Sequence, residues 1–103
     1  MTTGPVFEVV TLTIRDGVSV EEFAALDQAV EREHVALQPG FVARQSEAGH
    51  NGTWRVVVQW ASAADAEASM ASFSNASAAS AFMAAIKPGS MVMTRSGGGG
   101  PRS

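Results

Sequence analysis

The amino-acid sequence predicts an α+β domain of the ferredoxin-like type, in the order β-α-β-β-α-β, with a four-stranded antiparallel sheet and two helices on one face. Three observations predict this fold. Four short segments have the composition of strands. Two segments begin with a serine that can cap a helix and continue with helix-forming residues. An Asn-Gly pair between the second and third strand-like segments is typical of a tight hairpin.

The first half of the chain predicts one strand and one helix. Residues 6–15 are rich in β-branched side chains, which favour a strand. Its even-numbered residues from Val10 onward share one face and its odd-numbered residues the other. Ser19 and Glu22 have the spacing of a capping box. The helix that follows has apolar residues at helical spacing and is predicted to end at Pro39-Gly40; these residues are Phe23, Leu26, Val30 and Leu37.

The second half predicts two strands, a long helix and a last strand. Residues 41–47 and 54–60 flank the Asn-Gly pair. Residues 61–86 contain twelve alanines, which favour helix. The spacing of the bulky residues slips between Phe73 and Phe82, so we expect a bend or break near Ser74-Asn75. Residues 90–94 form the predicted last strand.

Size and composition limit the classes of function. The 103 residues indicate a single domain over residues 6–95, followed by a flexible glycine-rich tail over residues 96–103. A net charge of −3 without a basic stripe argues against nucleic acid as a partner. No apolar run reaches the ~18 residues of a membrane span, and no signal peptide is recognisable, so we expect a cytoplasmic protein.

One face of the predicted sheet has no helix to cover it. This face is half apolar and too large to leave in water without cost. We therefore expect a homodimer in which two sheets pack face to face as a closed or nearly closed barrel. The residues assigned to the face are Phe7, Val9, Thr11, Thr13 and Val57.

Three segments resemble a known family. They are residues 10–14 followed by Gly17, the sequence Pro39-Gly40-Phe41, and residues 57–62, in which Trp60-Ala61-Ser62 enters the second helical region. This pattern, over roughly residues 7–95, resembles the dimeric α/β-barrel proteins of the antibiotic-biosynthesis-monooxygenase type. The closing residues 82–88 resemble a mostly uncharacterised branch of that superfamily. The resemblance implies the fold more specifically than any chemistry, because the superfamily contains several activities.

The functional residues of that superfamily transfer only in part. In quinone-forming members, a tryptophan that ends the third strand lines a pocket for a polyphenol, and Trp60 matches it. An asparagine four residues earlier corresponds to Val56 here. Heme-degrading members need a histidine ligand where this chain has Ile86 and an asparagine where it has Val10. The resemblance therefore argues against heme degradation and weakens quinone-forming oxygenation.

The sequence predicts a hydrophobic pocket between sheet and helices. Trp60 and Trp54 share the helix-side parity, so they can either stack on a flat ligand or simply fill the core. His34, at the edge of the buried stripe of the first helix, can act as a general base or can be a half-exposed residue at a helix end. The residues predicted to bind substrate are Trp60, Trp54, Val10, Leu12, Val58, Phe73, Phe82 and Ile86.

Other polar or flexible residues have simpler interpretations. His50 is expected to be solvated in the hairpin loop. Glu8 shares the helix-side parity. It is interpreted first as a surface residue at the end of a strand, and alternatively as a carboxylate at the mouth of the pocket. Four methionines are expected to fill gaps in the core, namely Met70, Met83, Met91 and Met93. Three arginines are expected to carry charge on the sheet surface or at the dimer rim, namely Arg15, Arg44 and Arg55.

These observations lead to two alternative functions. The first is a cofactor-independent monooxygenase that acts on a small aromatic or polyketide-like compound, with His34 as the base and Trp60 as the stacking wall. The alternative is a non-catalytic or stress-related homodimer that binds a small hydrophobic ligand, which an almost wholly aliphatic pocket favours. No spacing of His, Asp and Glu suggests a metal site, and no cofactor motif is present in the sequence.

Overall fold

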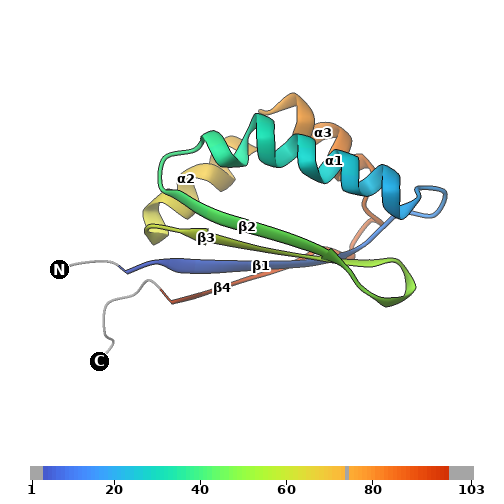
Figure 1. Cartoon of the computed structure of the whole chain (residues 1–103), viewed down its shortest axis with the longest axis horizontal. Coiled ribbons are helices and arrows are strands. Elements are labelled where there is room, and N and C mark those ends of the chain that lie inside the picture. Colours follow the sequence, from blue (N-terminus) through green and yellow to red (C-terminus); the bar gives the residue numbers. More distant parts are fainter. Residues whose placement is uncertain (1–3, 74, 98–103) are drawn as a thin grey trace.

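The chain forms four strands and three α-helices in a computed structural model that describes residues 4–73 and 75–97. The three α-helices lie on one side of the sheet (Figure 1). In chain order the elements are β1 (Val6–Thr13), α1 (Val20–Glu33), the 3-10 helix η1 (Val35–Leu37), β2 (Phe41–Ala48), the 3-10 turn η2 (His50–Gly52), β3 (Thr53–Trp60), α2 (Ala63–Phe73), α3 (Ser77–Ala84) and β4 (Val92–Gly97).

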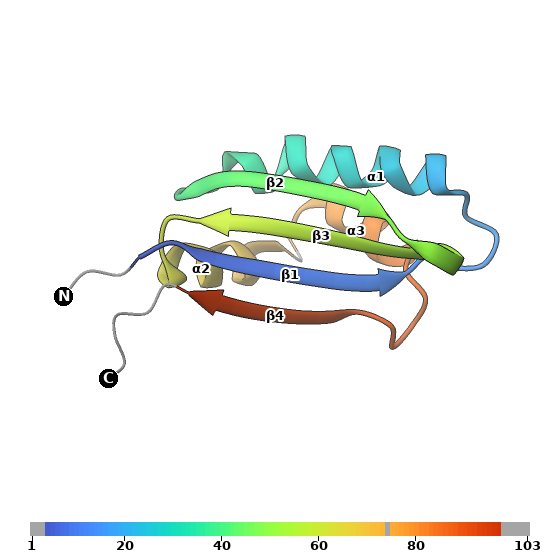
Figure 2. The same ribbon diagram turned by 60° about the horizontal axis from the view of Figure 1, so that its bottom comes forward.

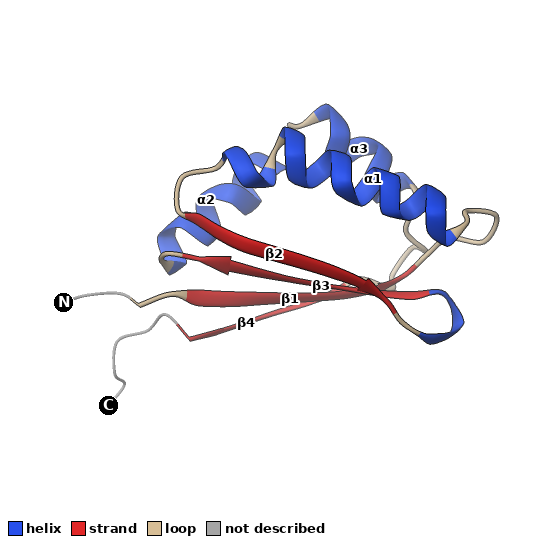
Figure 3. Cartoon of the chain, in the orientation of Figure 1, coloured by secondary structure: helices blue, strands red, loops and turns tan. Residues whose placement is uncertain are grey.

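The sheet has the strand order β2-β3-β1-β4, and every neighbouring pair is antiparallel (Figure 2). The first crossover joins β1 to β2 through α1, and the second joins β3 to β4 through α2 and α3 (Figure 3). This arrangement confirms the predicted ferredoxin-like α+β fold, with the second predicted helix present as two.

Local sequence signals predict the start of α1 correctly and its end incorrectly. The Ser19 hydroxyl accepts the backbone N–H of Glu22 at 3.0 Å, and the Glu22 carboxylate accepts the N–H of Ser19 at 2.8 Å. The predicted end of the helix, at Pro39-Gly40, is too late. α1 stops at Glu33, and Leu37 lies in η1 with 71% of its surface exposed. Leu37 therefore does not belong to the buried stripe, because the chain tightens into a 3-10 turn after His34.

The hairpin between β2 and β3 forms where the Asn-Gly pair predicted it. Asn51 and Gly52 both have positive φ angles, +56° and +78°. These two residue types adopt that region most readily, and it matches the twist of the flanking strands.

The second helical region breaks where the periodicity slips. α2 ends at Phe73, and the N–H groups of Asn75 and Ala76 bond to the carbonyls of Ser72 and Phe73 before α3 begins. Ser74 lies outside the described residues.

The last strand lies later in the chain than predicted. Ser90 belongs to the preceding turn, where its hydroxyl donates to the Lys87 carbonyl at 2.7 Å and accepts the Thr13 N–H at 3.1 Å. β4 then continues to Gly97, which pairs with Val6. Ser96 and Gly97 are thus strand residues instead of tail, whereas residues 98–103 of the predicted tail lie outside the described residues.

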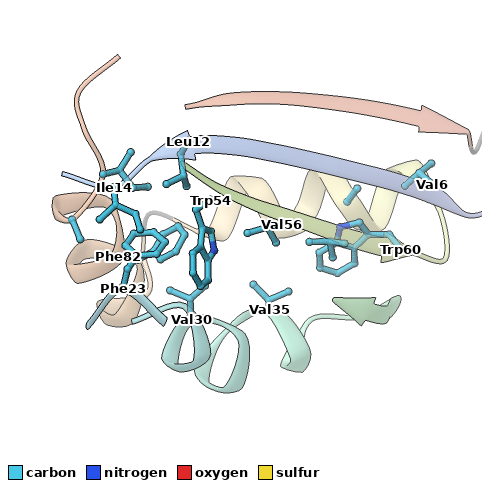
Figure 4. Packing of buried hydrophobic residues seen from close by; sticks show 14 residues of the cluster. Val6, Leu12, Ile14, Phe23, Val30, Val35, Trp54, Val56, Trp60 and Phe82 are labelled. Carbon is cyan, nitrogen blue, oxygen red and sulfur yellow. The ribbon is translucent and has the colours of Figure 1, made fainter. Parts of the chain in front are cut away.

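The core fills the space between the sheet and the helices (Figure 4). Trp54 and Trp60 both point into it, with 6% and 1% of their surface exposed, as their shared parity predicted. Trp54 packs edge-on against Phe23, with ring centroids 5.1 Å apart. Figure 4 shows Trp54 beside Phe23 and Phe82 at one end of the core and Trp60 beside Val6 at the other.

The opposite face of the sheet is not covered by any described element (Figure 1). Phe7 is 42% exposed and Val92 is 56% exposed. Val9 and Val57 lie opposite each other on neighbouring strands at the centre of this face. The open face, here defined as Phe7, Val9, Val57 and their neighbours of the same parity, is apolar at its centre but more polar at its edges than the sequence predicted. Its other apolar members are Val92 and Ala43, and its polar members include Arg55, Gln59 and Thr94.

Candidate functional site

A cavity of about 280 Å³ lies between the sheet and the helices, and its lining includes both Trp60 at one end of the core and Phe82 at the other. β1 and β3 form its floor, α2 and α3 its roof, and the start of β4 one of its edges. Its walls are predominantly apolar. The lining residues are Glu8, Val10, Val30, Val35, Arg44, Val56, Val58, Trp60, Ser69, Met70, Phe73, Phe82, Met83, Met91 and Met93.

The structure brings five of the residues predicted to bind substrate onto the cavity wall. They are Val10, Val58, Trp60, Phe73 and Phe82. Three others are buried in the core and do not line this cavity: Ile86, and Leu12 and Trp54, which instead border a second hollow of about 330 Å³ beside the β2–β3 hairpin. Parity placed the strand residues among them, Leu12 and Trp54 included, on the helix-facing side of the sheet, but position along the strand decides which of these reach the cavity.

Four methionines surround the cavity. Each is 36–44% exposed, so the prediction that they only fill gaps in the core is wrong. Two come from the helices and two from the start of β4 and the turn before it. Their flexible thioether chains let the cavity rim adjust to an apolar ligand. The four are Met70, Met83, Met91 and Met93.

Glu8 supplies a carboxylate to the cavity wall. The residue is 7% exposed, so its interpretation as a surface residue is wrong. The Trp60 Nε1–H donates to Glu8 Oε1 at 3.0 Å, and Arg95 donates to Oε2 from Nε at 3.1 Å and from Nη2 at 2.9 Å. These bonds satisfy a charge that would otherwise be costly to bury. They also fix the indole of Trp60 at the cavity wall.

Arg44 supplies the second charged group on the wall. Its side chain is only 4% exposed, so its assignment to the sheet surface or dimer rim is also wrong. The guanidinium binds Asp27 in a bidentate manner, at 2.8 and 3.0 Å, and contacts Glu31 at 3.3 Å. Trp54 Nε1–H points to the same Asp27 carboxylate at 3.4 Å.

Sequence reasoning missed Asp27 altogether. A signal was available, since Asp27 follows Phe23 by four residues and precedes Val30 by three, which places it on the buried stripe of α1. A carboxylate on such a stripe requires a cationic partner.

His34 lies next to the cavity but not on its wall. It caps the C-terminal end of α1 and is 7% exposed, so the half-exposed alternative is wrong. Its ring meets the Phe73 ring at 5.7 Å, and it lies 3.4 Å from both Gln38 Nε2 and Ser72 Oγ. Phe73, which does line the cavity, packs against the imidazole.

The remaining candidates lie away from the cavity. His50 is exposed in the hairpin turn, as expected, and Asn75 is exposed after α2. Over residues 4–73 and 75–97, no group of three or more His, Asp or Glu side chains is placed to hold a metal ion. In the same ranges no helix combines the length and apolar composition that a bilayer span requires.

Comparison of the fold with solved structures finds extensive similarity at low sequence identity. SnoaB, a cofactor-independent oxygenase from Streptomyces nogalater, is 18% identical over 89% of this chain and 90% of its own, with a TM-score of 0.73. A candidate antibiotic biosynthesis monooxygenase from Caulobacter crescentus is 19% identical over 93% and 91%, also with a TM-score of 0.73. NE2512 of Nitrosomonas europaea, of unknown function, is 18% identical over 94% and 89%, with a TM-score of 0.69.

Comparison of the sequence alone finds no matching protein-family profile and no matching curated protein. The structural likeness covers 89–94% of the chain in these three structures. The chain therefore has the fold of the antibiotic-biosynthesis-monooxygenase-like α+β proteins.

Proposed function

We propose that this protein is a cofactor-independent monooxygenase that oxidises a small aromatic compound in the cavity beside Trp60. The observation that supports the proposal best is an apolar cavity whose wall combines a fixed indole with one carboxylate, Glu8. SnoaB, which has the same fold, is named a cofactor-independent oxygenase, and this agrees with the proposal.

The cavity suits a flat, apolar ligand with few fused rings. Its volume of about 280 Å³ is at the small end of ligand sites in proteins. Trp60 presents an aromatic surface on which a ring can stack, and Phe73 and Phe82 lie on the same wall. The methionines of the rim can adapt to ligands of slightly different outline.

Oxidation in such a site requires no electron donor other than the substrate. An anthrone-type methylene, whose enol tautomer is a phenol, loses a proton to give a delocalised anion that reacts with O₂. The methylene becomes a carbonyl, the second oxygen atom leaves as water, and all four electrons come from the substrate. The protein supplies a base, an orienting surface and a cavity that excludes water.

Glu8 is the group best placed to be that base, since its carboxylate lies on the cavity wall. Proton transfer from the substrate to Glu8 would neutralise the carboxylate as the substrate anion forms, so the net charge of the site would be conserved. His34, the base predicted from the sequence, is the second candidate. It would act only after a local rearrangement, because the imidazole packs against Phe73 and does not itself reach the cavity wall.

Oxygen consumption with anthrone under air, without added flavin or metal, tests the proposal. We expect turnover by the wild-type protein and a decrease of about 10²–10⁴-fold in Glu8→Gln if Glu8 is the base. The same decrease in His34→Ala, with Glu8→Gln unaffected, would assign the role to His34. Glu33→Gln, which removes an exposed carboxylate on α1, is the matched control and should keep full activity.

A second function, ligand binding without turnover, is favoured by one observation. Both charged groups on the cavity wall already have protein partners, so neither is free to bind a reacting atom before those partners move. Anthrone that binds to the protein without any oxygen consumption would support this binding function and contradict the oxygenase.

We also propose that the active form is a homodimer that buries the open face of the sheet. A second copy of this chain offers the same half-apolar surface, so two such faces can cover each other.

A further inference from the structure

We propose that the cavity selects aromatic ligands without a permanent negative charge and rejects carboxylated analogues of the same size. This inference rests on the proposed function in one respect, that the cavity beside Trp60 is the ligand site. It goes further by naming the charge class of the ligand, and it is argued from the counter-ions around the cavity.

The first charged group of the cavity is Glu8 with Arg95 and Glu67. Arg95 is held at 2.9 Å by Glu8 on one side and at 3.4 Å by Glu67 on the other. One guanidinium thus faces two carboxylates, and the group has a formal net charge of −1. Glu8 is the member that reaches the cavity, so the charge presented to a ligand there is negative.

The second charged group also pairs one guanidinium with two carboxylates. Arg44 is held at 2.8 Å by Asp27 and at 3.3 Å by Glu31, again one guanidinium with two carboxylates. Arg44 does reach the cavity, but its Nη1 and Nη2 atoms are both engaged by carboxylate oxygens. It therefore offers little unneutralised positive charge to an anion.

Because the cavity is buried, the charges around it strongly affect whether a charged ligand can bind. Charges in an apolar cavity interact more strongly than in water, and an anion that leaves water needs a counter-charge to offset its lost hydration. Each guanidinium of the site is already neutralised by a buried carboxylate, Glu8 or Asp27. The outer carboxylates Glu67 and Glu31 are 70% and 40% exposed and add only solvent-screened negative charge. An anionic ligand would therefore find no unneutralised cation among the described residues of the cavity wall. An uncharged phenol faces no such penalty, and its hydroxyl can donate to the Glu8 carboxylate.

The selection is compatible with the proposed chemistry. A phenol that enters uncharged and passes its proton to Glu8 creates no new charge in the cavity. A ligand that enters with a carboxylate adds a second anion to a site in which Arg44 is already paired with Asp27 and Glu31, and Arg95 with Glu8 and Glu67.

A pair of ligands of equal size tests the inference. The probes are 6-hydroxy-2-naphthamide and 6-hydroxy-2-naphthoate, which differ in charge but hardly in shape, titrated into the full-length protein by isothermal calorimetry at pH 7. We expect the amide to bind at least about tenfold more tightly. In Glu8→Gln, which removes the wall carboxylate, the difference should shrink severalfold, whereas in Glu33→Gln it should stay as in the wild type.

The wild-type comparison decides the inference even if Glu8→Gln does not fold. Equal affinities, tighter binding of the naphthoate, or binding of neither probe would overturn the charge selection. The proposed oxygenase has a separate readout, the consumption of oxygen with anthrone. Charge selection without turnover would support the inference and contradict the proposed oxygenase. Turnover without charge selection would support the oxygenase and contradict the inference.

Discussion

Asp27 and Arg44 form the least exposed ion pair among residues 4–73 and 75–97, with side chains 5% and 4% exposed. The pair joins the buried stripe of α1 to the helix-facing side of β2, and Trp54 contributes an N–H to the same carboxylate. A buried pair of this kind adds little net stability when intact, but it is costly to break because the remaining charge stays in the interior.

Asp27→Asn should therefore destabilise the fold strongly. We expect a loss of about 3 kcal/mol in the free energy of unfolding, since Arg44 would keep only Glu31 as a counter-ion. Glu31→Gln is the control. The Glu31 side chain is 40% exposed, and its loss should cost less than about 1 kcal/mol. Urea denaturation followed by circular dichroism measures both, and equal losses would contradict the assigned difference.

At the scale of elements, the turn that leads into β2 depends on Gly40. Its φ angle is +82°, and a Cβ atom there would overlap the carboxylate of Asp65 in the first turn of α2. Asp65 is held in place by Ser62, whose hydroxyl donates to Asp65 Oδ2 at 2.9 Å and accepts its N–H at 3.2 Å. The start of α2 and the start of β2 therefore pack against each other with no room for a side chain.

Gly17 provides a matched comparison, because its φ is +91° but no described group lies near the place that a Cβ atom would take. Gly17→Ala should cost only the backbone strain, about 1–2 kcal/mol. Gly40→Ala should cost at least about 2 kcal/mol more, since the Asp65 side chain must also move. Thermal and urea unfolding of the two variants measures the difference, and equal destabilisation would show that the contact with Asp65 can relax freely.

The boundaries of elements were harder to predict than their existence. The capping box of α1 and the Asn-Gly hairpin are contained in a few consecutive residues, and both formed as predicted. The start of β4 was misplaced because it depends on the turn at Ser90, whose hydroxyl bonds to Thr13 of the first strand. A contact across 77 residues leaves no local pattern in the sequence.

At the scale of the whole molecule, the helices cover one side of the sheet and leave the open face to solvent (Figure 2). Phe7 and Val92 expose apolar surface on this face, and the proposed homodimer would bury it. In a two-fold symmetric homodimer, the open face of each copy would pack against the open face of the other.

Val57→Glu tests the homodimer, because it places a charge at the centre of the open face opposite Val9. We expect the wild type to sediment as a dimer at micromolar concentration and Val57→Glu to sediment as a monomer. Leu37→Glu, which changes an apolar residue that is 71% exposed in η1, is the control and should remain a dimer. A wild-type monomer, or a dimer that tolerates Val57→Glu, would exclude this interface.

The sequence by itself determined the order of the elements, the side of the sheet on which the residues of β1 and β3 lie and the position of the hairpin. These features follow from local rules, namely the alternation of side chains along a strand, the chemistry of helix caps and the turn preference of Asn-Gly. The tertiary structure alone decided that Trp60, and not Trp54, borders the cavity between the sheet and the helices. It also decided the pairing of Glu8 with Arg95, 87 residues away, and of Asp27 with Arg44, 17 residues away. Parity assigns a residue to a face, but its neighbours across that face come from distant parts of the chain, and only packing brings them together.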